Sequence, residues 1–133
     1  MAKRCVLVMV MVALLGGSSA VAVSAWSHIY SDSDYLTGTG DCWYYSMKLV
    51  AGTGYRFVLT NIPWSADFDM RIWRDYDNDR RLEEGEKQAT FNDGGNGQDE
   101  DGTWFAPQSA TYILEVYSYH GSGYYSLSVY KWI

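Results

Sequence analysis

Short runs of alternating apolar and polar residues, each ended by a turn rich in glycine or proline, constrain the fold of this chain most. In the run 42–50, every second residue is large and apolar: Trp43, Tyr45, Met47 and Leu49. The same pattern returns at 55–60, 68–73, 110–117 and 124–132, with shorter runs at 88–91 and 102–105. A period of two is typical of strands with one buried face.

The turn signals fall between these runs. Ala-Gly-Thr-Gly at 51–54 predicts a hairpin turn, and the Gly/Ser segment before Tyr124 predicts another hairpin spanning 110–132. No stretch has a convincing helical period. We therefore predict an all-β, single-domain fold, an antiparallel β-sandwich of jelly-roll type with seven or eight short strands.

The start of the chain has the features of a secretory signal peptide. Lys3 and Arg4 precede an apolar run from Cys5 to Leu15, and small residues follow up to Ala25. The apolar run is shorter than the about 20 residues that a membrane-spanning helix needs. We expect a signal peptide at 1–25, a secreted, extracellular chain without a membrane anchor, a polar segment at 26–40 with at most a short edge strand near Tyr35, and a β-sandwich domain at 41–133. A retained membrane anchor is the alternative.

The charge balance excludes one class of partner. Without residues 1–25 the chain has eight basic and sixteen acidic residues, and twelve of the acidic ones lie between Asp67 and Asp101. Nucleic-acid binding requires clustered lysine and arginine, so we expect none. Cleavage would also remove Cys5, which leaves Cys42 as a single cysteine that cannot form an intrachain disulfide. We expect a small buried hydrophobic residue there, with pairing between molecules as the alternative.

The segment from Asp75 to Glu86 matches the spacing of the calcium loop of EF-hands. Counting Asp75 as position 1, carboxylates stand at positions 1, 3, 5, 9 and 12, and position 7 offers a backbone carbonyl. Calcium binds about six to eight oxygens, and alternate side chains of a tight loop converge on it. The predicted ligands are Asp75, Asp77, Asp79, the carbonyl of Arg81, Glu83 and Glu86.

Two features depart from an EF-hand. Position 6 is Arg80 instead of glycine, and a positive φ there costs roughly 1 kcal/mol. The residues before the loop alternate as a strand, and Gly85 weakens an exit helix. The sequence thus predicts a calcium loop on a β scaffold, with a solvated acidic turn as the alternative.

Two further acidic motifs are weaker. Asp67 and Asp69 flank Phe68 and therefore point away from its face, toward neighbouring loops or toward the acidic loop. The run from Gly94 to Asp99 begins like a calcium-binding nonapeptide, but a single copy predicts an ordinary loop. A weak second cation site at Asp99 and Asp101 is the alternative.

The order of motifs resembles a known family. Asp41-Cys-Trp-Tyr44, Leu49 to Thr60, Asp67 to Ile72, Phe105-Ala-Pro107, Ala110 to Val116 and Gly121 to Val129 follow one another as in the bacterial pre-peptidase C-terminal domain. The resemblance covers roughly residues 36–130. It implies a secreted, non-catalytic β-sandwich that assists secretion, folding or targeting, and relatives on clostridial collagenases bind calcium and collagen. The acidic loop is longer here than the family pattern, and no peptidase is attached.

Catalytic motifs are absent from the sequence. The two histidines, His28 and His120, belong to no nucleophile or zinc pattern, so we predict that the protein is not an enzyme. Several tyrosines fall off the core-facing alternation: Tyr117, Tyr119, Tyr124 and Tyr130. Such rings either bind a ligand or stabilise cross-strand pairs.

The predicted function is a secreted, non-catalytic, calcium-binding module for an extracellular polysaccharide or protein ligand. The alternative is an accessory, chaperone-like or inhibitory partner of a separately encoded secreted protease.

Overall fold

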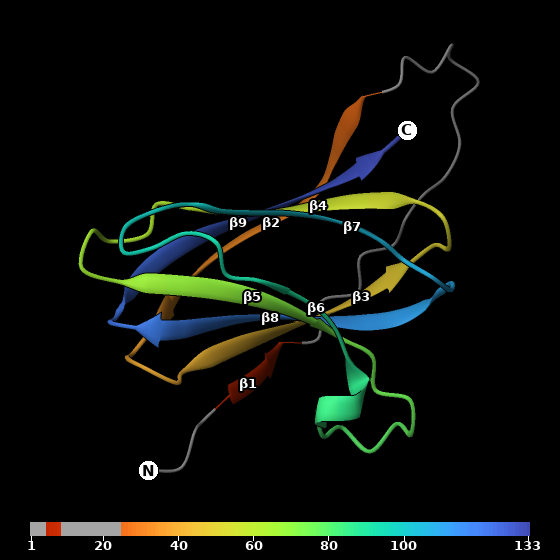
Figure 1. The fold of residues 1–133 in the computed structure, drawn as a ribbon, viewed down its shortest axis with the longest axis horizontal. Coiled ribbons are helices and arrows are strands. Elements are labelled where there is room, and N and C mark those ends of the chain that lie inside the picture. The colour runs from red at the N-terminus through yellow and green to blue at the C-terminus, as the bar shows by residue number, and fades with distance from the viewer. Residues whose placement is uncertain (1–4, 9–24) are drawn as a thin grey trace.

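The computed structural model describes residues 5–8 and 25–133, which form two β-sheets packed face to face (Figure 1). Apart from one short 3-10 helix, the regular structure of these residues is entirely strand. The elements are β1 Cys5–Val8, β2 Trp26–Leu36, β3 Cys42–Leu49, β4 Gly54–Thr60, β5 Asp67–Trp73, η1 Glu84–Glu86, β6 Lys87–Phe91, β7 Glu100–Phe105, β8 Ala110–His120 and β9 Gly123–Trp132. The predicted antiparallel β-sandwich is confirmed.

One sheet has the order β1-β3-β8-β5-β6 and the other the order β2-β9-β4-β7. All pairs are antiparallel except β1 with β3, which run parallel. Consecutive strands often lie in opposite sheets: β3 and β8 belong to the first, β4 and β9 to the second. The two hairpins predicted at 51–54 and within 110–132 are therefore wrong. A turn sequence reverses the chain, but burial of the apolar faces decides which strand the returning chain pairs with.

The core lies between the sheets and follows the predicted alternation. Phe68, Met70 and Ile72 of β5 face Phe57 and Leu59 of β4 across it, and all five side chains are buried. Fully burying such a side chain stabilises the fold by about 1.5–3 kcal/mol. The remaining core comes from alternate residues of the central strands: Tyr45, Met47, Leu114, Val116, Tyr125, Leu127 and Val129.

A polar contact crosses this core. The hydroxyl groups of Tyr45 in β3 and Tyr125 in β9 are 2.5 Å apart, and the Tyr45 hydroxyl donates to Asp32 of β2 at 3.0 Å. Burial, with the neighbouring Tyr125, raises the pKa of Tyr45, so the phenol remains a neutral donor. The contact joins the two sheets with satisfied polar groups, as buried hydroxyls require.

The segment 26–40 is more ordered than its composition suggests. β2 pairs with β9 over ten residue pairs, from Trp26 opposite Trp132 to Leu36 opposite Gly123. The expected short edge strand is thus an eleven-residue edge strand of the second sheet. Its apolar residues are few because an edge strand buries only part of its inner face.

The predicted signal peptide lies mostly outside the described residues, and only 5–8 and Ala25 of it are described. Cys42 is buried as expected, and in the full chain it is disulfide-bonded; the single cysteine is expected only for a chain without residues 1–25. Cys5, the other cysteine of the sequence, is the residue paired with Cys42 in the β1–β3 register. Among residues 5–8 and 25–133, no helix has the length and apolar character to cross a membrane.

Candidate metal site and aromatic end

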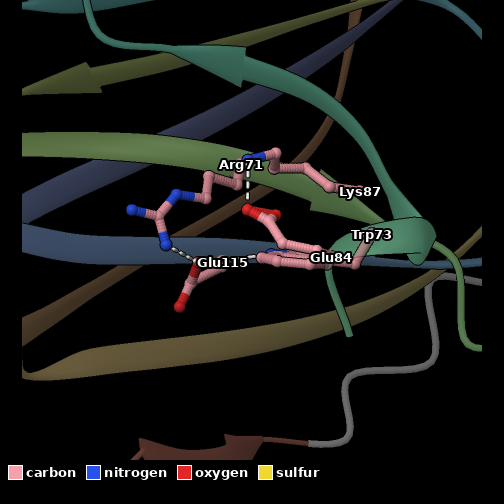
Figure 2. Close-up of polar contacts among 5 residues, drawn as sticks. All are labelled: Arg71, Trp73, Glu84, Lys87 and Glu115. Carbon is pink, nitrogen blue, oxygen red and sulfur yellow. Dashed lines mark hydrogen bonds and ion pairs between the residues drawn. The ribbon is translucent and has the colours of Figure 1, made fainter. Parts of the chain in front are cut away.

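The strand that leads into the acidic loop is fixed by a buried carboxylate. Glu115 of β8 accepts hydrogen bonds from Arg71 Nη1 and Trp73 Nε1, both at 3.2 Å (Figure 2). On the far side of the loop, Lys87 Nζ lies 2.9 Å from Glu84 and 6.0 Å from the Trp73 ring centre. These contacts fix the position of β5 before the loop and of β6 after it.

The loop closes on itself through Glu86. Its carboxylate accepts the backbone N–H of Tyr76 at 3.2 Å and that of Glu83 at 3.1 Å. Its carbonyl accepts the Arg74 N–H at 2.9 Å. Glu86 is buried although it carries a charge, and a buried carboxylate is found where hydrogen bonds or a cation hold it. The predicted last ligand is thus directed into the loop.

Asp75 holds the first half of the loop. Its carboxylate accepts the N–H of Asp79 at 3.2 Å and that of Arg80 at 2.8 Å. Asp79 in turn accepts the N–H of Arg81 at 2.8 Å. These contacts draw the chain into a tight coil with the carboxylates on its inside.

Arg80 has a φ of 62° and Asn78 a φ of 60°. The positive φ expected at position 6 is therefore present, on an arginine. A non-glycine residue there costs roughly 1 kcal/mol, and the hydrogen bond from Arg80 to Asp75 offsets part of that cost. After the loop a single 3-10 turn, η1, replaces the exit helix of an EF-hand.

All five predicted carboxylates lie in groups whose oxygens are within 4.8 Å of one another. One group is Asp75, Asp77 and Glu86; the other is Asp77, Asp79 and Glu83. Asp77 belongs to both, so the two groups adjoin through the carboxylate at position 3. The carbonyl of Arg81 stays a prediction. Figure 1 shows the loop and η1 projecting from one end of the sandwich.

The close approach of these carboxylates shifts their pKa values. Although desolvation acts in the opposite direction, the backbone N–H groups led by Arg80 lower the pKa of Asp75. A hydrogen bond with Asp75, with desolvation, raises the pKa of Asp77 to about 6. Two carboxylates this close share a proton unless a cation neutralises them.

The four predicted ligand-binding tyrosines do not form one face. Tyr117 and Tyr119 lie on β8 and Tyr124 and Tyr130 on β9, in opposite sheets. Tyr117 is buried with the Arg71 guanidinium 3.8 Å from its ring centre, and Tyr130 packs edge-on against His28. Only Tyr119 and Tyr124 are strongly exposed, at 67% and 69%.

Tyr119 and Tyr124 flank the β8–β9 turn, and a third exposed ring lies next to that turn. A Cβ at Gly123 would stand 2.3 Å from Pro63, and one at Gly121 would stand 2.9 Å from the carbonyl oxygen of Ser65. This close approach brings Trp64, which is 86% exposed, to the same end of the sandwich. We call Trp64, Tyr119 and Tyr124 the aromatic end.

The sequence analysis missed Trp64, although a tryptophan after proline in a polar turn has no core role to explain it. The aromatic end and the acidic loop lie at opposite ends of β5, because Asp67 pairs with His120 at the start of that strand and the loop follows Trp73 at its end.

The other acidic residues separate into two kinds. Asp101 forms an ion pair with Arg56 on the outside of β7, so the weak cation site at Asp99 and Asp101 gains no support. Asp67 and Asp69 lie beside Glu100, toward the neighbouring 92–99 loop and not toward the acidic loop. Glu100 was not predicted as a site residue, although strand alternation places it on the same face as the buried Gly102.

No protein-family model matches the chain, and a search of curated proteins finds no matching relative. Solved structures are similar. The Aeromonas hydrophila periplasmic lysozyme inhibitor of g-type lysozyme has 16% identity over 98% of this chain and 99% of its own, with a TM-score of 0.61. The corresponding inhibitor from Salmonella Typhimurium has 18% identity over 98% and 99%, with a TM-score of 0.51.

The pre-peptidase C-terminal domain of collagenase from Bacillus anthracis has 16% identity over 97% of both chains, with a TM-score of 0.56. The resemblance found in the order of sequence motifs is thus confirmed at the level of the fold. The described chain is a single β-sandwich with the fold of the pre-peptidase C-terminal domain.

Proposed function

We propose that this protein is a secreted, non-catalytic, calcium-binding β-sandwich that binds a protein ligand outside the cytoplasm. The observation that carries the calcium assignment is the convergence of five carboxylates within a loop that is already closed by Glu86. Their oxygens form a set without nitrogen or sulfur donors, which suits a hard cation such as calcium.

The protein ligand is supported by the structural neighbours and by the aromatic end. Two neighbours are inhibitors of g-type lysozyme, itself a protein, and the third is a domain of a collagenase. Exposed tryptophan and tyrosine rings contribute much binding energy at protein interfaces. We therefore assign partner contact to Trp64, Tyr119 and Tyr124, and leave the buried Tyr117 out of that contact. Secretion rests on the predicted signal peptide and on the periplasmic location of the two inhibitors.

A second candidate function is inhibition of a secreted enzyme. It is favoured by the two inhibitor structures and agrees with the accessory role that we considered from the sequence. An inhibitor must bind its enzyme tightly enough to block it, whereas a targeting module need not affect activity.

The test combines calorimetry with binding. Titration of the purified chain with calcium should give saturable binding, and Glu86→Gln should remove the part that belongs to the acidic loop; no binding would contradict the calcium assignment. Surface plasmon resonance against g-type lysozyme, collagen and polysaccharide resins, with a lysozyme activity assay, separates the partner classes. Binding to polysaccharide alone would overturn the protein ligand, and lysozyme binding without loss of its activity would overturn the inhibitor.

A further inference from the structure

A second group of carboxylates lies away from the acidic loop. Asp67 and Asp69 stand at the start of β5, and Glu100 is the first residue of β7 in the opposite sheet. Each offers an oxygen, and these oxygens all lie within 4.8 Å of one another. Glu100 follows Asp69 by 31 positions, so the tertiary fold brings it to the two aspartates.

Two members of this group are almost completely buried. Asp69 is 3% exposed and Glu100 is 2% exposed. The Glu100 carboxylate accepts the N–H groups of Asp93 at 3.2 Å and Gly94 at 2.5 Å, which fixes its orientation. Oδ1 of Asp69 has no hydrogen-bond partner anywhere in the described chain. A buried carboxylate oxygen without a partner has lost its hydration, and no hydrogen bond compensates the desolvation free energy.

No lysine or arginine of the described residues forms an ion pair with this group. Among residues 5–8 and 25–133, the ion pairs join Arg56 to Asp101, Arg71 to Glu115 and Lys87 to Glu84, and none reaches the three carboxylates. A polar cavity of about 460 Å³ opens beside Asp67 and Asp69; Arg71 and Lys87 also line it, but their ion pairs are with Glu115 and Glu84. The group therefore takes up either a proton or an external cation.

The geometry matches a hard divalent cation. Calcium–oxygen distances are about 2.4 Å, so two ligands on opposite sides of the ion stand about 4.8 Å apart. The donor set is all oxygen, which disfavours zinc and copper, and the open cavity leaves room for water ligands. Burial already restricts the side chains of Glu100 and Asp69, so they lose little conformational entropy when a cation binds.

We propose that Asp67, Asp69 and Glu100 bind a second divalent cation of the calcium class. The site is separate from the acidic loop and lies at the aromatic end, where the Gly97 N–H donates to the Ala66 carbonyl at 2.7 Å. The cation would join the start of β5 to the 92–99 loop and thereby hold the segment that carries Trp64. The two sites then have different tasks: one orders a peripheral loop, the other the loops around the aromatic end.

The competing explanation is a shared proton among the three carboxylates, and Asp69→Asn distinguishes the two. Asparagine keeps the shape of Asp69 but removes its charge. Its amide can donate a hydrogen bond as a protonated carboxyl would, but it removes a negative ligand from a cation site. In the proton explanation this variant is as stable as the wild type or more so, and its calcium stoichiometry is unchanged. In the cation explanation it loses one bound calcium per chain.

The experiment is calcium calorimetry on the full chain and five variants. The wild type should bind two calcium ions, Glu86→Gln one, Asp69→Asn one, and the double variant none. Asp99→Asn, an exposed acidic neighbour outside the group, is the matched control and should bind two. Asp67→Asn, at a half-buried position, should raise the calcium Kd of the second site at least about tenfold. It replaces Asp69→Asn in the comparison if near-UV circular dichroism shows that Asp69→Asn does not fold.

Equal stoichiometry in the wild type, Asp69→Asn and Asp67→Asn would overturn the second site. Retention of both calcium ions by Glu86→Gln, with a loss in Asp69→Asn, would instead contradict the acidic-loop site and support this one. The two failures are therefore distinguishable.

Discussion

Glu86 accepts the backbone N–H of Tyr76 at 3.2 Å, so the last carboxylate of the acidic loop is bound to the loop's second residue. The contact spans ten positions of a segment with little apolar content. The hydrogen bonds of a charged side chain hold this loop in place, whereas apolar packing holds the rest of the sandwich. They also orient Glu86, the predicted last calcium ligand, without a bound ion.

Calcium should raise the melting temperature of the protein. A ligand that binds only the folded state stabilises it by about 2.7 kcal/mol at one hundred times Kd. Differential scanning calorimetry in calcium and in chelator measures the shift. Glu86→Gln should remove most of it and Asp101→Asn should keep it, since Asp101 pairs with Arg56 instead. Equal losses in both variants would place the cation elsewhere.

Alanine at the aromatic end should weaken partner binding without affecting the acidic loop. Trp64→Ala or Tyr119→Ala should each cost about 1–2 kcal/mol of binding free energy, roughly five- to thirtyfold in Kd. Tyr130→Ala is the control, because that ring packs on His28 in the outer face of the other sheet. Plasmon resonance against the partner found in the binding screen measures the effect, and an equal loss in the control would refute a localised contact.

Tyr125→Phe should destabilise the sandwich. The change leaves the Tyr45 hydroxyl without the partner 2.5 Å away but with Asp32 still at 3.0 Å, so we expect a loss of about 1 kcal/mol. Urea unfolding at pH 7 gives the value, and the calcium-dependent shift should stay the same. Tyr119→Phe, at an exposed ring, should change stability little.

The state of Cys42 should report on cleavage of the N-terminus. In the full chain Cys42 is disulfide-bonded, and denatured protein should resist iodoacetamide until it is reduced. A secreted chain that begins at Trp26 lacks Cys5 and should be labelled without reductant. Mass spectrometry of the protein from the culture medium decides this. Labelling of a chain that retains residue 5 would contradict the disulfide.

The Arg56–Asp101 pair should make a small contribution that depends on pH. The hydrogen bond from Arg56, against some desolvation, lowers the pKa of Asp101. A lowered carboxyl pKa stabilises the fold above the unfolded value of about 3.9, and this stability is lost as the pH falls through the folded value. Both side chains are more than a third exposed, so we expect less than about 1 kcal/mol, screened by salt. Urea unfolding of wild type and Asp101→Asn should differ at pH 7 and converge near pH 2.

The sequence alone determined most of the strands, though not the length of β2, and the acidic loop. Alternation in runs such as 42–50 identifies both the strand and its buried face, because the side-chain period of a strand is a local property. The loop from Asp75 to Glu86 could also be predicted, since its proposed ligands lie within twelve consecutive residues and their spacing is fixed by the chain itself.

Only the tertiary structure decided which strands pair and which distant residues meet. The turn at 51–54 looks like a hairpin turn, yet β3 and β4 lie in opposite sheets. Asp69 and Glu100, and likewise Trp64 and Tyr119, come together through the packing of loops at one end of the sandwich. Such contacts depend on how the two sheets bury their apolar faces against each other, and that choice is made by the whole core and not by any local sequence.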